Sequence, residues 1–372
     1  MKHIAPISLT LCLCLGLTGC GSAQAPHSSA PAECAVSSTQ EETAAQVTQG
    51  EDGSYSTDLF AMDTFMSMKA YGDNSQAALQ DISAMVSDLD SRLSVTKESS
   101  EIYALDHAEG QSVTLSDTTA DLLNKALALG ETTDGALAFT SYPLSRAWGF
   151  TTGAYQIPSQ DTIDTLLPLV DDTKISLDGS SASLPENAML DLGSVAKGYA
   201  GDRAAEILKE AGVDSALLNL GSSTIRAIGE KPDGSPWRIA IQDPQNTESY
   251  AGVVSIRDMA VDTSGGYERY FTGEDGEVYW HIIDPATGYP AKNGLISVTI
   301  LSNSALQGDG LSTALFVMGL DKAVDYWRQQ GDFEFILITD QGEIYVSEGA
   351  QDCFEPLGDY QNAAVHVVTH EA

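Results

Sequence analysis

Helical and strand patterns are interspersed from about residue 57 to residue 366, without the regular alternation that builds a doubly wound sheet. Helical periodicity is clearest over Gln76–Leu93, over a segment capped by Ser116 and ending at Gly130, and over Ala196–Ala211. The predicted strands are 216–220, 237–241, 253–256, 297–301, 333–339 and 343–346, with a turn at 340–342. No linker and no repeat of fixed period interrupts this region of the sequence. The pattern predicts one large α+β domain over residues 57–372, with helices packed on mixed sheets.

The first 56 residues have a different character. The apolar run Ile7–Leu17 follows Lys2 and is too short to span a bilayer, but it has the length of a signal-peptide core. It ends in Leu17-Thr18-Gly19-Cys20, which resembles the bacterial lipobox. We therefore predict a signal peptide over residues 1–19 and a lipidated Cys20. A polar segment through residue 56, rich in Ser, Ala, Gln, Glu and Thr, is expected to be a flexible tether.

This leader predicts an extracytoplasmic protein that is lipid-anchored to a bacterial membrane. Of the five cysteines, Cys12 and Cys14 would leave with the signal peptide and Cys20 would carry lipid. A bridge between the remaining Cys34 and Cys353 stays open, and no disulfide framework is implied.

The charge balance restricts the partners. The chain has 18 Lys and Arg against 53 Asp and Glu, a formal net charge of −35. Such an excess repels nucleic-acid backbones, so we expect no nucleic-acid partner. A phosphate-bearing ligand would have to be held locally, with a metal ion to offset the charge.

Three segments carry polar residues in patterns typical of binding or catalytic sites. In the first, Leu190 to Ala200, small residues lead into a helix and place Lys197 near its start. Free backbone N–H groups at a helix start attract anionic groups, and Lys197 would add a charge. The alternative is that the glycines only serve helix packing.

The second segment, Tyr279 to Pro290, alternates as a strand and then turns. This pattern predicts His281 and Ile283 on one face, with Asp284 at the mouth of the loop. The alternative is a histidine satisfied by a core hydrogen bond.

The third segment, Gly308 to Leu315, places Asp309 and Thr313 four residues apart. On a helix they would share one face and offer a carboxylate and a hydroxyl to one point. Such oxygen ligands suit Mg²⁺, which completes its octahedron with water and phosphate oxygens. The alternative is that Asp309 only caps the helix.

The order and spacing of these segments resemble the FAD:protein FMN transferases, the ApbE family, from about Met62 to Leu320. The other matching motifs are Met62-Asp63-Thr64-Phe65, Ser100-Glu101-Ile102, Trp148-Gly149-Phe150, Ala216 to Gly221, Pro232-Asp233-Gly234 with Trp237-Arg238-Ile239, Thr263-Ser264-Gly265 and Tyr267 to Phe271. The resemblance implies a single ApbE-like catalytic domain that binds FAD as its substrate. With Mg²⁺, such an enzyme moves the FMN half of FAD onto a Thr or Ser of an acceptor flavoprotein and releases AMP. The resemblance also implies an acceptor with a Ser/Thr-Gly-Ala-Ser/Thr type of motif.

Residue roles follow from the same resemblance. It places His281 at the position of the proposed catalytic histidine, and we predict that His281 takes the proton from the acceptor hydroxyl while Lys197 holds phosphate. FAD contacts are implied for Met62, Ala138, Phe139, Thr140, Asp191, Lys197 and Ile283, and metal contacts for Ser194 through its carbonyl, Asp309 and Thr313.

The sequence departs from the family pattern at three places. Ala138 occupies a position where the family usually has Asp, Ser222-Ser223 stand where it usually has a second Gly after Gly221, and Asp262 replaces a common small residue. Two other functions are compatible with the same residues: a Mg²⁺-dependent FAD pyrophosphatase that gives FMN and AMP, and a non-catalytic flavin-binding lipoprotein.

Overall fold

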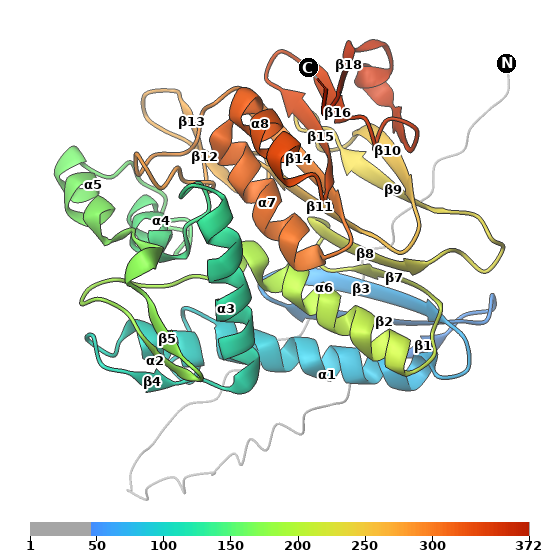
Figure 1. The fold of residues 1–372 in the computed structure, drawn as a ribbon, viewed down its shortest axis with the longest axis horizontal. Coiled ribbons are helices and arrows are strands. Elements are labelled where there is room, and N and C mark those ends of the chain that lie inside the picture. Colours follow the sequence, from blue (N-terminus) through green and yellow to red (C-terminus); the bar gives the residue numbers. More distant parts are fainter. Residues whose placement is uncertain (1–45, 372) are drawn as a thin grey trace, which may run out of the picture. The chain divides into compact units, whose positions relative to one another are not determined.

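A ten-stranded sheet runs through the computed structural model, which describes residues 46–371 (Figure 1). In spatial order its strands are β1 (Thr48–Gln49), β2 (Ser54–Ala61), β3 (Thr64–Tyr71), β7 (Ser215–Asn219), β8 (Thr224–Gly229), β11 (Ala260–Gly265), β14 (Leu295–Ser302), β15 (Glu334–Thr339), β16 (Ile344–Ser347) and β18 (Val365–Val368). Neighbouring strands are antiparallel, except that β16 and β18 run parallel. The strands follow chain order across the sheet, but long insertions separate some neighbours, so β3 pairs with β7 across the segment 72–214.

Long helices cover one face of this sheet. They are α1 (Ser75–Leu93), α6 (Gly193–Glu210), α7 (Ala305–Met318) and α8 (Leu320–Gln330). In Figure 1, α1, α6 and α7 follow one another across the face, and α6 packs against both α1 and α7. Their buried apolar residues, such as Leu79, Leu208 and Leu315, form the largest core with the sheet.

A small sheet covers the opposite face. It consists of β17 (Phe354–Pro356), β10 (Tyr250–Ile256) and β9 (Trp237–Gln242). Buried residues of these strands, including Trp237 and Val254, pack against Ile225, Ile336 and Val346 of the large sheet in a second core. The large sheet is therefore buried on both faces at its centre.

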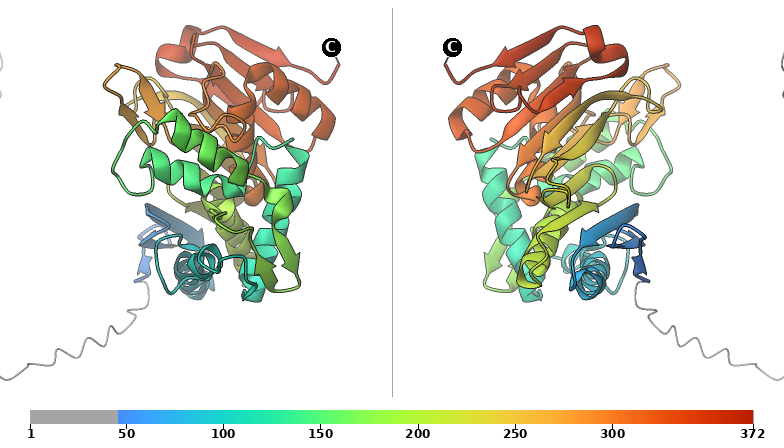
Figure 2. Two further views of the ribbon diagram at one scale, coloured as in Figure 1. Left: turned by 90° about the vertical axis from the view of Figure 1, so that its left-hand side faces the viewer. Right: turned by 90° about the vertical axis from the view of Figure 1, so that its right-hand side faces the viewer.

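The remaining elements form the side of the molecule that carries α4 and α5, which face the viewer in the left panel of Figure 2. These elements are α2 (Glu101–Asp106), α3 (Asp117–Thr132), α4 (Tyr142–Trp148), α5 (Gln160–Leu166), the sheet of β4 (Val113–Thr114), β6 (Ser181–Ser183) and β5 (Ser176–Asp178), and the hairpin of β12 (Tyr270–Thr272) and β13 (Val278–Trp280). A third apolar cluster joins α4, α5 and the hairpin through Leu144, Trp148, Phe150, Ile163 and Ile283, whereas the buried residues of α2, α3 and β6 belong to the largest core.

The fold class is confirmed, because helices pack on mixed sheets within one unit that spans the described residues. The three predicted helices are present, and Ser116 caps α3 by accepting a hydrogen bond from the Thr119 amide. α6 begins at Gly193, three residues before the predicted start at Ala196.

The predicted domain boundary at residue 57 is wrong. It falls inside β2, and β1 lies wholly within the segment expected to be tether. The reason is pairing with a later strand: Ser54 and Ser56 lie opposite Tyr71 and Lys69 of β3. The predicted signal peptide, Cys20 and Cys34 lie outside the described residues. Within residues 46–371, no helix is both long and apolar enough to cross a membrane.

One prediction about a single element is also wrong, and one alternative is excluded. The strand expected to run through His281 to Ile283 ends at Trp280, although the amide of His281 still donates to the Arg269 carbonyl at 3.0 Å, in register with the pairing of Trp280 and Tyr270. α7 begins at Ala305 with Ser304 as its cap, so Asp309 lies in the second turn and does not cap the helix.

Candidate active site

The crossing of α6 and α7 brings Lys197 and Asp309 together. At this point α6 carries Gly198, where an added Cβ would lie 2.1 Å from the carbonyl oxygen of Ala305. The two backbones can approach this closely only because residue 198 has no side chain. Lys197 Nζ then lies 3.3 and 3.4 Å from the two carboxylate oxygens of Asp309, and the Gly198 amide donates to Asp309 Oδ2 at 2.9 Å.

The start of α7 is fixed by a second contact from α6. The Asp202 carboxylate accepts hydrogen bonds from the amides of Ala305 and Leu306 at 2.7 and 3.1 Å, and from the Ser304 hydroxyl at 2.7 Å. A carboxylate at a helix start satisfies amides that have no partner within the helix. Asp202 therefore sets the register in which α7 presents Asp309 to α6.

Thr313 lies on the same helix, one turn after Asp309. Its hydroxyl is 3.3 Å from that of Ser264 on β11, which also lies 2.8 Å from the Ser312 hydroxyl. The predicted pairing of Asp309 and Thr313 on one helical element is confirmed, and β11 adds a polar neighbour to it.

Two carboxylates lie at this crossing. Asp309 is 5% exposed, and burial raises its pKa while the Lys197 ammonium opposes that shift. Asp262 on β11 is fully buried, and burial together with the charge of Asp309 raises its pKa well above the usual range. Neither oxygen of Asp262 has a hydrogen-bond partner among the described residues.

These oxygen atoms are the donors that Mg²⁺ prefers, so the residues present fit such an ion. Between residues 46 and 371 there is no group of three or more His, Cys, Asp or Glu side chains placed to hold a metal. A cation held here would therefore depend on few carboxylates and would complete its shell with hydroxyl, carbonyl, water or phosphate oxygens.

Asp191 lies two residues before the start of α6. Its carboxylate accepts a hydrogen bond from the Gly193 amide at 2.8 Å, and burial raises its pKa while Arg269 and Lys197 oppose that shift. Its amide donates to the Phe139 carbonyl at 2.9 Å, which ties the segment 138–140 to the same place.

The segment 138–140 is itself fastened by Asp172. The Asp172 carboxylate accepts from the amides of Phe139 and Thr140 at 2.8 and 2.9 Å and from the Thr140 hydroxyl at 2.6 Å. Both side chains are buried. A ligand contact from this segment would therefore come from its backbone or from the half-buried Ala138.

His281 is half-buried and lies beside Arg269. Its Nδ1 is 3.3 Å from the Arg269 carbonyl, which favours the tautomer protonated at Nδ1 and leaves Nε2 as a proton acceptor. Burial and the positive charge of Arg269 lower the pKa of His281 to about 4. The imidazole is therefore neutral at pH 7 and able to accept a proton.

A group of aromatic rings lies beside His281. Phe150 meets the His281 ring edge-on at 6.4 Å, and Phe271 stacks between Tyr155 and Tyr279 with centroids 5.4 Å from each. Stacked rings of this kind give a rigid apolar wall beside the histidine.

The hairpin turn between β2 and β3 adds Met62. Met62 and Asp63 have φ of 51° and 57°, and the Met62 amide donates to Asp90 at 2.8 Å. Asp63 raises the pKa of Asp191, so the turn lies on the same side of the site. Ile283, in contrast, is 8% exposed and packs in the third apolar cluster.

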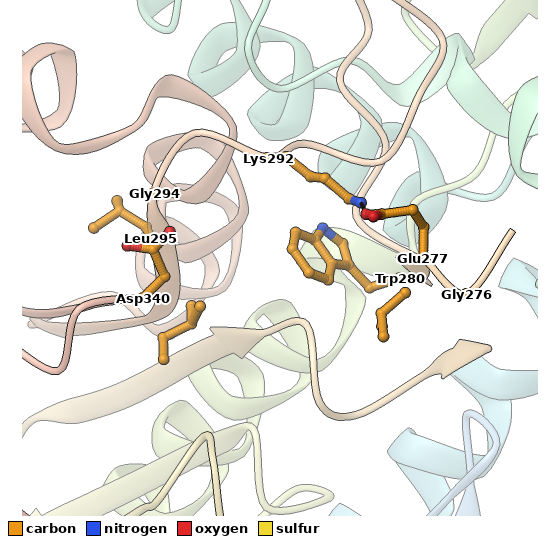
Figure 3. A pocket seen from close by; sticks show the side chains of 9 residues that line it. Gly276, Glu277, Trp280, Lys292, Gly294, Leu295 and Asp340 are labelled. Atoms are coloured by element: carbon orange, nitrogen blue, oxygen red, sulfur yellow. Dashed lines mark hydrogen bonds and ion pairs between the residues drawn. The ribbon is translucent and has the colours of Figure 1, made fainter. Parts of the chain in front are cut away.

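A separate cavity of about 330 Å³ lies behind the β12–β13 hairpin (Figure 3). Trp280 and the ion pair of Lys292 with Glu277 line it. His281, Lys197 and Asp309 are not among its lining residues, so it is distinct from the site above.

Residues 62–337 match the sequence model of the ApbE family. The chain belongs to the ApbE family. One relative, an FAD:protein FMN transferase of Klebsiella pneumoniae, is 32% identical over 308 residues, which cover 82% of this chain and 95% of the relative. Another FAD:protein FMN transferase, of Haemophilus influenzae, is 34% identical over 291 residues, covering 74% and 83%.

Solved ApbE structures share the fold. The ApbE protein of Thermotoga maritima superposes with a TM-score of 0.74 and 32% identity, covering 80% of this chain and 97% of that one. The flavin transferase ApbE of Vibrio cholerae gives 0.72 and 28% identity, covering 81% and 99%.

Sequence reasoning assigned no role to several residues that shape this ApbE site. Arg269 acts on both Asp191 and His281, and its signal was its place in the family motif Tyr267 to Phe271, in a chain poor in basic residues. Asp106 accepts the Leu190 amide at 2.7 Å, and burial raises its pKa to about 7. No sequence pattern marked Asp106, because a contact 84 residues along the chain leaves no periodicity.

Proposed function

We propose that this chain is an FAD:protein FMN transferase that depends on a divalent cation. The observation that carries the proposal is the Lys197–Asp309 pair, at 3.3 Å, in the same charged cluster as a neutral His281. Lys197 lowers the pKa of His281 and the pKa of Asp191, so these groups lie within electrostatic range of one ammonium. A proton acceptor and a phosphate-binding cation at one site suit transfer of a phosphoryl group to a hydroxyl.

The chemistry follows from these groups. His281 Nε2 accepts the proton of an acceptor Ser or Thr hydroxyl, and the oxygen forms a bond to the phosphorus on the FMN side of FAD. The bond from that phosphorus to the bridging oxygen breaks, and AMP leaves with the bridging oxygen. The Lys197 ammonium holds a phosphate oxygen throughout. The cation, when bound, would neutralise charge on the pyrophosphate and on the leaving AMP.

Asp309, Thr313 and the Ser194 carbonyl are the proposed cation ligands. The Gly198 amide, which a regular helix directs to the Ser194 carbonyl, donates to Asp309 Oδ2, so that carbonyl lies close to the Asp309 carboxylate. This supports a role for the Ser194 carbonyl as a ligand. For FAD, the proposed contacts are those of Met62, the segment Ala138-Phe139-Thr140, Asp191, Lys197 and Ile283.

The proposal includes a location. The apolar run ending in Leu17-Thr18-Gly19-Cys20 supports lipidation at Cys20 and attachment to the outer side of a bacterial membrane. The acceptor is a second protein with a Ser/Thr-Gly-Ala-Ser/Thr motif on the same side.

The test mixes the purified protein with FAD, Mg²⁺ and an acceptor protein bearing that motif, and follows AMP release and acceptor mass together. AMP that appears in step with a flavinylated acceptor is the expected result. His281→Ala should slow transfer by about 10²–10⁴-fold at saturating FAD and Mg²⁺, the usual share of a general base. His366→Ala, which alters an exposed histidine on β18, is the matched control and should transfer at the wild-type rate.

Other outcomes would contradict the proposal. AMP with free FMN and an unmodified acceptor would identify a pyrophosphatase. FAD retained without AMP would identify a binding protein, and full transfer by His281→Ala would mean that another group accepts the proton.

A further inference from the structure

Asp262 has no partner for its charge. It is fully buried on β11, and neither carboxylate oxygen has a hydrogen-bond partner in the part of the chain that the structure describes. A buried carboxylate without a partner destabilises a fold, so such a group in a native protein calls for an explanation. The hydroxyl of Thr224, opposite Asp262 in the register of β8 and β11, is buried and makes no hydrogen bond, although it lies near enough to lower the pKa of Asp262.

The surroundings of Asp262 are those of the proposed cation site. An added Cβ on Gly308 would lie 2.1 Å from Asp262 Oδ2, so the carboxylate occupies the room left by the absent side chain. The next residue of α7 is Asp309, whose charge raises the pKa of Asp262 more than that of any other side chain. Ser264, two positions along the same face of β11, contacts the Thr313 hydroxyl. One face of β11 therefore follows α7 past both Asp309 and Thr313.

The charges here do not balance. Asp262 and Asp309 are two carboxylates, and the Lys197 ammonium is already paired with Asp309. Lys197 also acts on Asp262, whereas Asp202 adds further negative charge. A dication would supply the missing positive charge, and its preference for carboxylate oxygens matches the two that have no partner.

We propose that Asp262 is a second carboxylate of the divalent-cation site, so that β11 and α7 each contribute one negative charge to the ion. The inference deepens the proposed function, since it rests on a cation at Asp309 and Thr313. It also explains why Asp262 and Gly308 occur together: the glycine provides the space in which the carboxylate lies.

The experiment measures binding of Mn²⁺ alone, without FAD, to the purified protein by electron paramagnetic resonance, with Mg²⁺ as competitor. Asp262→Asn keeps the shape of the side chain and removes the charge, and it should weaken Mn²⁺ binding by about tenfold or more. Asp309→Asn should abolish binding. The matched control is Asp243→Asn, which alters another buried carboxylate at the end of β9 and should leave the Mn²⁺ affinity unchanged.

A second pair of variants separates space from charge. Gly308→Ala alone should lower the melting temperature, because the new methyl group meets Asp262. Asp262→Ala with Gly308→Ala should restore the melting temperature while Mn²⁺ binding stays weak. This pair also serves if Asp262→Asn fails to fold.

Equal Mn²⁺ affinity in wild type and Asp262→Asn, or in wild type and the double variant, would overturn the inference and leave Asp262 as a buried acid facing Thr224. Absence of Mn²⁺ binding in the wild type would overturn it too, together with the cation part of the proposed function. Intact, Asp262-dependent binding in a protein that transfers no FMN would count against the transferase alone.

Discussion

At the scale of single residues, His281 sets the pH range of the reaction. Its pKa is lowered to about 4 by burial and by Arg269, whereas a free histidine titrates near 6.5. As pH falls from 7 to 5 the imidazole stays neutral, so the proton acceptor survives. We expect the acid limb of kcat/KM that belongs to His281 to lie near pH 4, measured by transfer rate against pH and by NMR titration of the ring.

The same shift acts on stability with a definite sign. Between pH 6.5 and 4 the unfolded chain binds a proton at this position and the folded chain does not, so His281 lowers stability as pH falls through that window.

An inflection in the transfer rate near pH 7 that disappears in Asp106→Asn would belong to Asp106, whose pKa is about 7. An acid limb of kcat/KM at pH 6.5 that disappears in His281→Ala would contradict the lowered pKa of His281.

At the scale of elements, the site depends on how closely α6 and α7 approach. Gly198→Ala would place a methyl group 2.1 Å from the Ala305 carbonyl, and the helices would have to separate. We expect a loss of about 1–3 kcal/mol in the free energy of unfolding. The rate of transfer should also fall, because Lys197 moves away from Asp309. Urea unfolding and the transfer assay measure the two effects.

Gly130→Ala in α3 is the matched control for that substitution. An added Cβ there has its nearest neighbours at 3.5 Å, an ordinary contact. It should stabilise the protein by up to about 1 kcal/mol, because alanine favours a helix. Equal effects at both glycines would show that the close approach of α6 and α7 does not matter.

Some elements could be predicted from the sequence and others could not. α1 and α3 carry regular apolar spacing, and the Ser116 cap of α3 was readable because capping is local. The start of α7 was missed because Ser304 and Asp202 together hold it, and Asp202 lies on another helix. The unpaired burial of Asp262 and the role of Asp106 arise only from contacts between distant segments, which one sequence does not reveal.

At the scale of the whole molecule, the ordered sheet begins before the predicted domain boundary. A variant beginning at residue 57 would lose β1 and the part of β2 that pairs with Lys69 to Tyr71. We expect it to melt several degrees below a variant beginning at residue 46, since edge pairing and the buried Ser54 are lost. Equal melting temperatures in a thermal scan would mean that these strands add nothing to the fold.

The strand order has a consequence for how the protein is made. Ser67 of β3 pairs with Asn219 of β7, and β11 pairs with β14, which precedes α7 in the sequence. Each pairing closes a long loop, so its entropy must be lost before the contact forms, and such topologies fold slowly. A ribosome that has completed only the first two thirds of the chain has made Lys197 but not Asp309. The growing polypeptide thus has no assembled site until its last third emerges, and FAD can bind there only after synthesis is nearly finished.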